Sequence, residues 1–527
     1  MAYLHQLNSN LRISSVVTTG FRFRNFVYNT YSTMTQSSKT YEDAVGDLNS
    51  LQTNAASLEA IRNSKGQLNN RSLPEMINFL ERVGYKIPDL NQLNVVHVTG
   101  TKGKGSTCAI SESILRQVGK STPIKTGLFT SPHLIEVRER IRINGRPIEK
   151  SLFTKYFYEC WERLEETQEL ALPNQPLRPT YFRYLTLLAF HVFMQEKVDV
   201  ALMEVGVGGE FDSTNIIEKP VVCGISAIGI DHENVLGTTI PEIAWHKAGI
   251  IKYETPVFTV PQLPEAMKVI QTRANEKKAV CSIVKPYSAY KNSPKALGLS
   301  GKHQFENAAL SIALCRTWLS HNRPELIVQA NEEELPTSFI DGLEKVRWPG
   351  RAQKFTVKNI PNVAWFVDGA HTAESMEICA DWFKQDTSKE GDKNVERILL
   401  FNGAKGRSGT KLLKILTELQ PHVNFRHVLF CPNLPYSHVS SNADSCNLTV
   451  EFDQSLLPQQ VLADFWKESV GKMTANTECQ THIFSSIEES VQWIEEHAKR
   501  SDKKVQALTS GSLHLVGGLL SVLKVPI

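Results

Sequence analysis

Residues 95–107 read VVHVTGTKGKGST, and this stretch decides the fold that we expect. An apolar, β-branched run ends in a loop of three glycines and two lysines, and a segment compatible with a helix follows at once. A strand that enters a glycine loop at the start of a helix points backbone N–H groups and the helix dipole at an anion. We therefore predict a phosphate-binding loop in which Lys104 reaches the β- and γ-phosphates of a nucleotide.

The loop departs from the common phosphate-loop pattern G-x-x-x-x-G-K-[ST], because Gly105 separates Lys104 from Ser106. The shorter form G-T-K-G-K-G-S remains. Since glycine has no Cβ, Gly100, Gly103 and Gly105 allow the backbone to wrap closely around phosphate oxygens. The alternative interpretation of the same residues is a flexible basic turn.

Length and composition limit the class of protein. A chain of 527 residues with 41% hydrophobic and 21% charged residues indicates a soluble globular protein of two or three domains. A net charge of only +3 gives no bulk electrostatic reason to expect a nucleic-acid or membrane surface. No apolar run approaches the roughly 18 residues of a membrane span. The nine cysteines are scattered and form no C-x-x-C pair, which favours free thiols in a reducing compartment.

The first forty residues differ from the rest of the chain. They combine positive charge with many Ser, Thr and Asn residues, and the first acidic residue is Glu42. This composition is typical of a mitochondrial presequence, with a merely disordered terminus as the alternative. Met34 offers a second start that would remove the segment. We therefore expect a mitochondrial form, in the matrix or associated with the inner membrane, and a cytoplasmic form.

Strand and helix patterns alternate along the rest of the chain. This β-α-β rhythm predicts the α/β class, with parallel, doubly wound sheets. We expect a P-loop ATPase domain at 41–345 that resembles the central domain of Mur ligases, and a smaller Rossmann-like domain at 346–527. The stretch 331–349 reads as a linker between them. The expected strands are 95–99, 125–129, 198–204, 221–230, 364–367, 398–402, 427–430 and 505–510.

Several polar residues follow predicted strands, where ligands bind in parallel sheets. Glu204 ends the strand 198–204 before a glycine turn, a placement expected for Mg²⁺ opposite a phosphate loop. His232 ends the next strand and is a candidate metal or substrate contact, with a core histidine as the alternative. Ser131, in the loop Thr130-Ser131-Pro132-His133, would by itself be read as a turn residue.

Other candidates are basic or lie in the second domain. Lys247 lies in or near an apolar helix end, where a buried lysine is costly unless it is paired or modified. Arg351 lies near the domain junction, where its charged fork would suit a γ-phosphate clamp. Asp368 ends a strand and His371 follows the turn after it. Linker residues and strand-end caps are the alternative interpretations.

Ten segments, in this order, resemble those of the folylpolyglutamate synthase family, which belongs with the Mur ligases to the ATP-dependent amide ligases. Together they extend over most of the chain from about residue 73, and ten ordered matches are far more specific than any one alone. They are GTKGKGS (100–106), TSPHL (130–134), RERIRING (138–145), EVGVGGEFDSTN (204–215), DHxxxLG (231–237), HKAGIIK (246–252), HQxxNA (303–308), WPGR (348–351), DGAHT (368–372) and TSGSLHLVGG (509–518).

The resemblance implies roles for the matching residues. ATP would contact Gly103, Lys104, Gly105, Ser106, Asn307, Arg351 and Asp368, and Mg²⁺ would contact Ser131, Glu204 and His232. Lys247 would carry a carbamate, and His371 and Arg407 would lie at the glutamate site. The implied catalytic residues are Lys104, Lys247, Asp368 and His371. The aromatic segment 179–184 would lie near the pterin end of folate.

One position departs from the family pattern. Animal members usually have an acid after the arginine that follows F-N, whereas Phe401-Asn402 leads here to Arg407-Ser408. The loss of that acid weakens the case for a role of Arg407 and leaves the predicted activity unchanged.

The resemblance implies an ADP-forming ligase that adds L-glutamate by γ-linkage to tetrahydrofolates through an acyl phosphate. ATP would be the co-substrate, Mg²⁺ the metal and K⁺ an activator. We expect small-molecule partners only (folate polyglutamates, L-glutamate and ATP), no nucleic acid, no membrane span and a monomer. The alternatives are a dihydrofolate synthase or bifunctional enzyme that adds the first glutamate to dihydropteroate, a Mur ligase, and a regulatory P-loop NTPase.

Overall fold

The computed structural model describes residues 39–52, 69–293, 297–326, 333–388, 394–403, 409–436, 444, 455–473 and 479–526. Most of the predicted presequence, including Met34, lies outside the described residues, and so do Arg407 and Ser408. Among the described helices, none has the length and apolar character that crossing a membrane requires.

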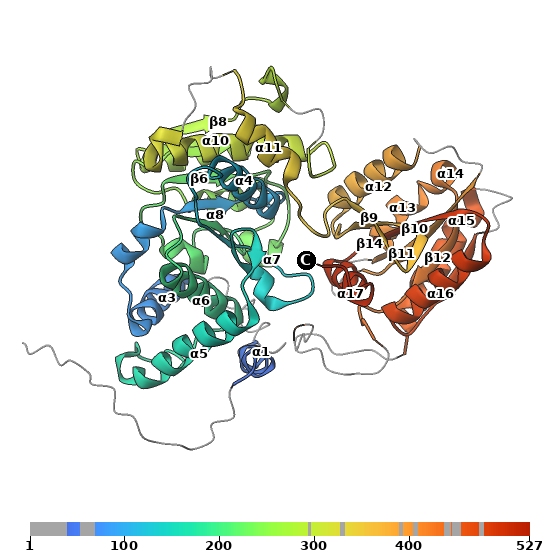
Figure 1. Cartoon of the computed structure of the whole chain (residues 1–527), viewed down its shortest axis with the longest axis horizontal. Coiled ribbons are helices and arrows are strands. Elements are labelled where there is room, and N and C mark those ends of the chain that lie inside the picture. The colour runs from blue at the N-terminus through green and yellow to red at the C-terminus, as the bar shows by residue number, and fades with distance from the viewer. Residues whose placement is uncertain are drawn as a thin grey trace, which may run out of the picture. The chain divides into compact units, whose positions relative to one another are not determined.

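The first sheet has eight strands in the order β4-β3-β2-β5-β1-β6-β7-β8. It belongs to the part of the chain drawn from blue to green in Figure 1. Pairing is parallel from β2 to β8, and β3 and β4 add an antiparallel edge. The strands are β1 (Val96–Thr99), β2 (Thr126–Phe129), β3 (Ile141–Ile143), β4 (Arg146–Pro147), β5 (Val200–Glu204), β6 (Val222–Ile225), β7 (Val257–Thr259) and β8 (Cys281–Ile283). The predicted strand 221–230 is thus shorter, because the chain leaves the sheet after Ile225.

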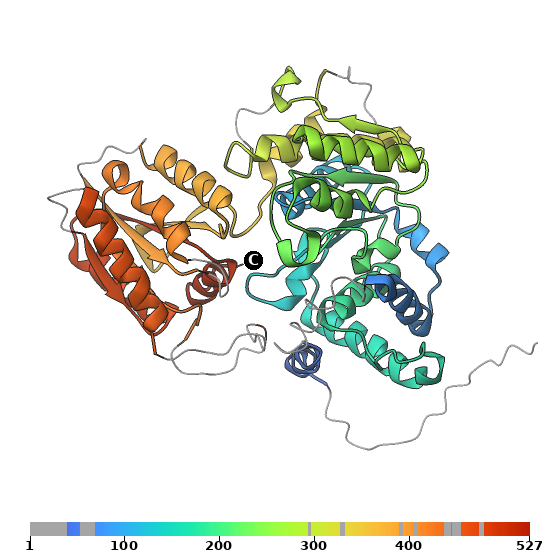
Figure 2. The same cartoon turned by 180° about the vertical axis from the view of Figure 1, so that it is seen from behind.

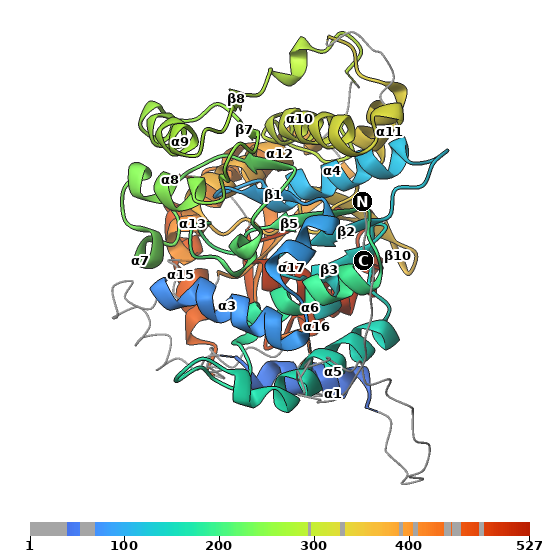
Figure 3. The same cartoon turned by 90° about the vertical axis from the view of Figure 1, so that its left-hand side faces the viewer.

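Side chains of each central strand alternate between two apolar layers, as the pleat of a β-strand requires. Leu128 and Leu202 pack against α4 (Lys104–Val118) and α10 (Gln304–Asn322). Their neighbours along the strands, Phe129 and Met203, pack on the opposite face with α5 (Lys150–Glu166) and α6 (Tyr181–Gln195). Figure 3 shows these two helical layers on either side of β1, β5 and β2. Burial on both faces explains why these strands are continuously apolar.

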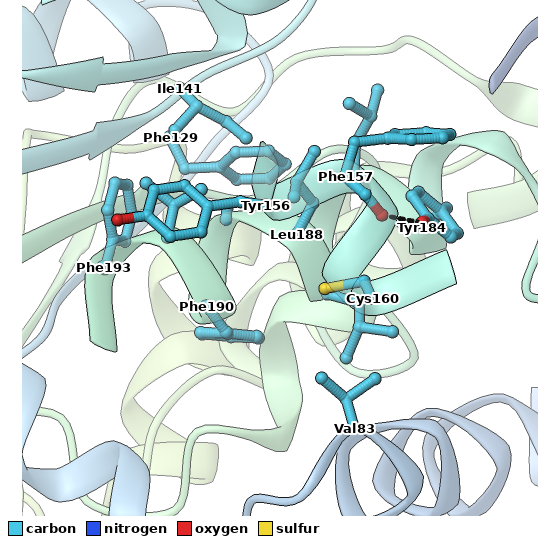
Figure 4. Packing of buried hydrophobic residues seen from close by; sticks show 14 of the residues in the cluster. Val83, Phe129, Ile141, Tyr156, Phe157, Cys160, Tyr184, Leu188, Phe190 and Phe193 are labelled. Atoms are coloured by element: carbon cyan, nitrogen blue, oxygen red, sulfur yellow. Dashed lines mark hydrogen bonds between the residues drawn. The ribbon is translucent and has the colours of Figure 1, made fainter. Parts of the chain in front are cut away.

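The layer that contains α5 and α6 is rich in aromatic residues (Figure 4). Tyr184 is fully buried, and its hydroxyl donates a hydrogen bond to the carbonyl of Phe157 at 2.9 Å. This bond satisfies the one polar atom that the Tyr184 ring brings into the core. Leu188 lies in the same layer and is also fully buried.

The predicted linker 331–349 was wrong in part, because it contains the helix α11 (Thr337–Lys345). Phe339 and Leu343 of this helix are buried in the same apolar layer as α4. Three large apolar residues over nine positions mark the helix (Phe339, Ile340 and Leu343), and the neighbouring acids and prolines hide this short pattern.

The second sheet has six strands in the order β13-β12-β11-β14-β10-β9, and only β9 is antiparallel. It belongs to the part of the chain drawn from orange to red in Figure 2. Helices α12 (Ala373–Thr387), α13 (Gly409–Thr417) and α15 (Leu457–Met473) cover one face, and α16 (Ile487–Arg500) and α17 (Leu513–Val522) cover the other. The strands are β9 (Gln353–Val357), β10 (Ile360–Asp368), β11 (Val395–Phe401), β12 (Phe425–Phe430), β13 (Gln480–Ile483) and β14 (Lys504–Ser510). The predicted α/β class with two parallel-rich sheets is confirmed.

The remaining α-helices connect the strands or pack beside them. They are α1 (Tyr41–Ser50), α3 (Asn69–Val83), α7 (Glu233–Leu236), α8 (Ile240–Ala248), α9 (Pro264–Glu276) and α14 (Gln420–Val423).

The aromatic layer yields a stability prediction. Leu188→Ala should lower the free energy of unfolding by about 2–5 kcal/mol, because it removes buried methyl groups and leaves a cavity. The matched control is Leu170→Ala, since Leu170 is 59% exposed and should change stability by less than about 0.5 kcal/mol. Urea unfolding followed by far-UV circular dichroism checks both. Equal midpoints for the two variants would contradict the assignment of Leu188 to the core.

Candidate active site

The phosphate-binding loop joins β1 to α4, which begins at Lys104. Gly103 precedes the helix with φ of 87°, and no side chain caps its N-terminus. A Cβ on Gly103 would lie 2.2 Å from Asn307 Oδ1, so only glycine fits. In the part of the chain that the structure describes, no side chain accepts from the first N–H groups of α4, which are placed to bind an anion.

Backbone and hydroxyl contacts from the segment after β6 fix the loop. Thr101 N and Lys102 N donate to Ala227 O at 2.8 and 3.1 Å, and Ser226 Oγ donates to Lys102 O at 2.7 Å. Thr101 Oγ1 also donates to Gly229 O at 3.0 Å. The loop is thus held in place by the neighbouring strand end. Sequence reasoning missed Ser226, because a lone serine after an apolar strand carries no local signal.

Two lysines meet at one carbonyl of the loop. Lys104 Nζ donates to Gly100 O at 3.1 Å, and Lys247 Nζ donates to the same oxygen at 2.8 Å. Lys247 lies in the last turn of α8 and is only 3% exposed. Burial, and next the nearby charge of Lys104, place the pKa of Lys247 well below its ordinary value. The environment therefore favours the neutral amine of Lys247.

Glu204 ends β5 directly beside the first turn of α4. It is 4% exposed, and its Oε2 accepts a hydrogen bond from Ser131 N at 2.9 Å. A Cβ on Gly105 would lie 3.3 Å from the same oxygen. Burial raises the pKa of Glu204, and the charge of Lys104 opposes that shift. The structure thus brings Ser131 and Glu204 together at the phosphate loop.

The loop after Glu204 is ordered by a buried carboxylate. Asp212 Oδ2 accepts from Gly206 N and Val207 N, both at 3.1 Å, and Oδ1 accepts from Thr214 N at 3.0 Å. These bonds hold the glycine turn that follows the metal-ligand candidate. The sequence analysis predicted no role for Asp212, although Asp212 belongs to the segment 204–215 that resembles the family.

Asn307 approaches the loop from α10. Its side-chain amide donates to Gln304 Oε1 at 2.8 Å, and Thr107 Oγ1 donates to Asn307 Oδ1 at 3.5 Å. Gln304 Nε2 in turn lies 3.5 Å from Ser106 Oγ. Both buried amides therefore line the first turn of α4. Gln304, like Asp212, belongs to a segment that resembles the family (303–308), but the sequence analysis did not predict a role for it.

His232 occupies a more open position. It is exposed, it precedes the short helix α7, and its φ of 54° is left-handed. Asp231 Oδ1 accepts from His232 N at 2.9 Å, and Asp231 Oδ2 forms an ion pair with Lys102 Nζ at 3.3 Å. The acid next to His232 is thus tied to the phosphate loop, and the histidine ring extends from an exposed turn.

In the second sheet, the sequence-predicted residues lie at the end of β10. Asp368 Oδ2 accepts from Ala352 N at 2.7 Å, and a Cβ on Gly369 would lie 3.0 Å from Arg351. Burial raises the pKa of Asp368, and the guanidinium of Arg351 opposes that shift. His371 Nδ1 hydrogen-bonds with Gly369 O at 2.9 Å. Arg351, Asp368 and His371 therefore form one group, while Arg407 lies outside the described residues.

A phosphate loop at the carboxyl edge of one parallel sheet, followed by a second Rossmann-like sheet, defines an α/β enzyme of the P-loop class. Residues 352–522 match the family model described as the dihydrofolate synthetase C-terminal domain. A solved structure of Mycobacterium tuberculosis folylpolyglutamate synthase complexed with ADP has the same fold, with a TM-score of 0.64 and 22% identity. The alignment covers 91% of this chain and 99% of that one.

Curated relatives identify the family. The chain is 41% identical to the mitochondrial folylpolyglutamate synthase of Bos taurus, over 92% of both chains. It is 42% identical to the folylpolyglutamate synthase of Saccharomyces cerevisiae strain AWRI796, over 92% of this chain and 87% of that one. The chain belongs to the folylpolyglutamate synthase family.

The chain is accordingly an ATP-dependent ligase that adds glutamate to folates, as the sequence predicted. The relatives' names do not favour the alternative of a dihydrofolate synthase. The mitochondrial name of the bovine relative agrees with the mitochondrial location expected from the N-terminal composition.

Proposed function

We propose that the two sheets divide the ligase chemistry between two domains, at 41–345 and 346–527. The first would hold the phosphates of ATP, and the second would present Arg351, Asp368 and His371 to the reacting groups. The observation that carries this proposal is the convergence of Lys104, Lys247 and Glu204 on the loop between β1 and α4.

ATP binding rests on the first turn of α4. Gly103, Lys104, Gly105 and Ser106 would surround the phosphates, with backbone N–H groups and one ammonium group as donors. The Mycobacterium tuberculosis relative complexed with ADP supports nucleotide binding by this fold. Asn307, which lies against Gly103, would contact the nucleotide from α10.

The donor set beside this loop fits Mg²⁺. Mg²⁺ prefers oxygen ligands, and Glu204 and Ser131 supply a carboxylate and a hydroxyl next to the helix start. His232 would contribute a ring nitrogen from the exposed turn before α7. Bound there, Mg²⁺ would neutralise charge on phosphate oxygens. We also propose that K⁺ activates the enzyme, as the family resemblance implies.

The reaction needs an activated acyl group, because a carboxylate does not condense with a protonated amine near neutral pH. We propose that the γ-carboxylate of a tetrahydrofolate attacks the γ-phosphorus of ATP, which releases ADP and leaves an acyl phosphate. The amine of L-glutamate then attacks the acyl carbon, and phosphate leaves. Lys104 and Arg351 would stabilise the charge that spreads over the transferred phosphoryl group.

The second group would orient the nucleotide and the glutamate. Arg351 offers a charged fork next to Asp368, which suits a γ-phosphate contact. Asp368 would face ATP, and His371, ordered by its bond to Gly369 O, would lie at the glutamate site. Arg407 is proposed there as well, from the family resemblance.

An aromatic surface near β5 suits the pterin end of folate. The Arg140 guanidinium lies 5.7 Å from the centre of the Tyr181 ring, and Phe182 lies against Gly206 in the turn after Glu204. Planar rings beside the half-buried guanidinium of Arg140 would stack a flat, polar heterocycle. We therefore propose that Tyr181 and Phe182 contact the pterin.

Lys247 is proposed to carry a carbamate. A neutral amine is the nucleophile that adds to CO₂ with loss of one proton, and the buried position of Lys247 favours that neutral form. The product is an anion beside the phosphate loop, which would serve as a ligand for a second metal.

The proposed assembly and location extend what the relatives support. We propose a monomer that acts on small molecules, with a second form in the cytoplasm and with association of the mitochondrial form with the inner membrane.

The first test feeds purified chain with MgATP, labelled glutamate and either tetrahydrofolate or dihydropteroate, and resolves the products by mass. We expect a ladder on tetrahydrofolate in which each product is one glutamate heavier than the last. Product from dihydropteroate alone would show the first-glutamate ligase instead. ATP binding without product from either substrate would support a regulatory nucleotide-binding protein.

Lys104→Ala should abolish the ladder, because it removes charge stabilisation on the order of several kcal/mol from the phosphoryl transfer. Lys120→Ala, just beyond the same helix, is the matched control, since its side chain is 61% exposed and pairs with Asp341. The control should retain full turnover. Near-normal turnover of Lys104→Ala would refute its assignment to the phosphates.

Lys247→Ala should lower ligation and should be partly rescued by acetate or formate if a carbamate acts as a ligand. Intact-mass analysis under CO₂ of the chain that keeps Lys247 should show the added carboxyl group at Lys247. Absence of rescue together with an unmodified Lys247 would leave its bond to Gly100 O as its role.

A further inference from the structure

A second cluster of ligand-type side chains lies in the second sheet, away from Asp368. Glu396 is near the start of β11, His427 is near the start of β12, and His497 is in the last turn of α16. Strands β10, β14, β11 and β12 are mutually parallel, and Asp368 ends β10. The cluster is therefore at the amino edge of the sheet, opposite the edge that carries Asp368.

The separations between these side chains match those of ligands around one ion. His427 Nε2 lies 3.2 Å from Glu396 Oε1, and His497 Nε2 lies 3.0 Å from Glu396 Oε2. One potential ligand atom from each residue lies within 4.8 Å of the other two. Ligands at about 2.0 Å from a tetrahedral Zn²⁺ are about 3.3 Å apart. The three side chains thus need little movement to surround such an ion.

His497 Nε2 lies 3.0 Å from Glu396 Oε2, a contact that is an ion pair only when the ring is protonated. Among the described residues, no group meets this buried nitrogen with strict hydrogen-bond geometry. A buried polar atom without a partner costs free energy. A cation between the nitrogen and the carboxylate would satisfy both atoms.

Neighbouring side chains hold the ligand rings in place. His427 Nδ1 lies 3.2 Å from His482 Nε2, and a proton on Nδ1 would leave the lone pair of Nε2 facing Glu396. Ser501 Oγ donates to Glu396 Oε2 at 3.3 Å. The Trp493 ring stacks on His497, with 5.0 Å between ring centres and an angle of 8°. This outer layer is the arrangement that tunes and orients metal-binding histidines.

We infer that Glu396, His427 and His497 bind one divalent transition metal ion, for which Zn²⁺ is the best match, with water in the fourth position. Two imidazoles and one carboxylate are ligands that Zn²⁺ accepts. The ion would join β11, β12 and α16, and its role would be to stabilise this end of the second sheet. The competing interpretation is an ion pair between a protonated His497 and Glu396.

The test titrates chelator-treated, cysteine-alkylated chain with Zn²⁺ by calorimetry and with Co²⁺ by visible absorption. We expect one equivalent of Zn²⁺ to bind, a visible Co²⁺ band of tetrahedral type, and a higher Tm with Zn²⁺ that a chelator reverses. His497→Ala and Glu396→Gln should each weaken binding by about 100-fold or more, and His482→Ala by about 10-fold. His422→Ala is the matched control, because His422 is an exposed histidine on α14, the helix that precedes β12 of the same sheet.

Three results would overturn the inference. These are no saturable Zn²⁺ binding, an affinity that is unchanged in both His497→Ala and Glu396→Gln, or an equal loss in the His422→Ala control. Far-UV circular dichroism and ligase activity without added Zn²⁺ show that each variant is folded. Glu396→Gln keeps the shape of the side chain, so it decides the question if His497→Ala fails to fold.

Discussion

The carbonyl oxygen of Gly100 is the point on which the site depends. It accepts from Lys104, which belongs to the helix that it precedes, and from Lys247, which is 147 positions away along the chain. These two bonds tie α8 to the phosphate loop and bring two amine groups into one small volume. Burial and then the charge of Lys104 lower the pKa of Lys247, so an anion bound at the loop would favour the charged form of Lys247.

Close packing around the same loop excludes other residues. Gly103 lies against Asn307, and Gly105 lies against Glu204, so the helix start, α10 and the end of β5 meet with no space for a Cβ at Gly103. Ser226 and Thr101 then fix the loop from the next strand. The positions of Asn307 and Glu204 therefore follow from how closely the loop packs.

The sequence predicted the class of fold, the central strands of both sheets and the phosphate loop, because these depend on local patterns. Continuous apolar runs such as Val200–Glu204 indicate buried parallel strands, and the glycine and lysine spacing indicates the loop. The helix α11 was missed because its nine positions give too short an apolar pattern. Ser226 and Gln304 were missed because their contacts are made by residues distant in sequence, which no local spacing reveals. The cluster of Glu396, His427 and His497 is hidden for the same reason.

The charge of Lys247 links two events at the phosphate loop. An arriving phosphate anion favours the ammonium form of a nearby lysine, whereas addition to CO₂ requires the neutral amine. Burial favours the neutral amine in the structure, and the bond to Gly100 O holds it beside the loop. A carbamate would therefore form most readily before the nucleotide binds, and its negative charge would then need a cation between it and the phosphates. If the carbamate proposed for Lys247 forms, electrostatics would thus make the binding of a cation and the binding of the nucleotide favour each other.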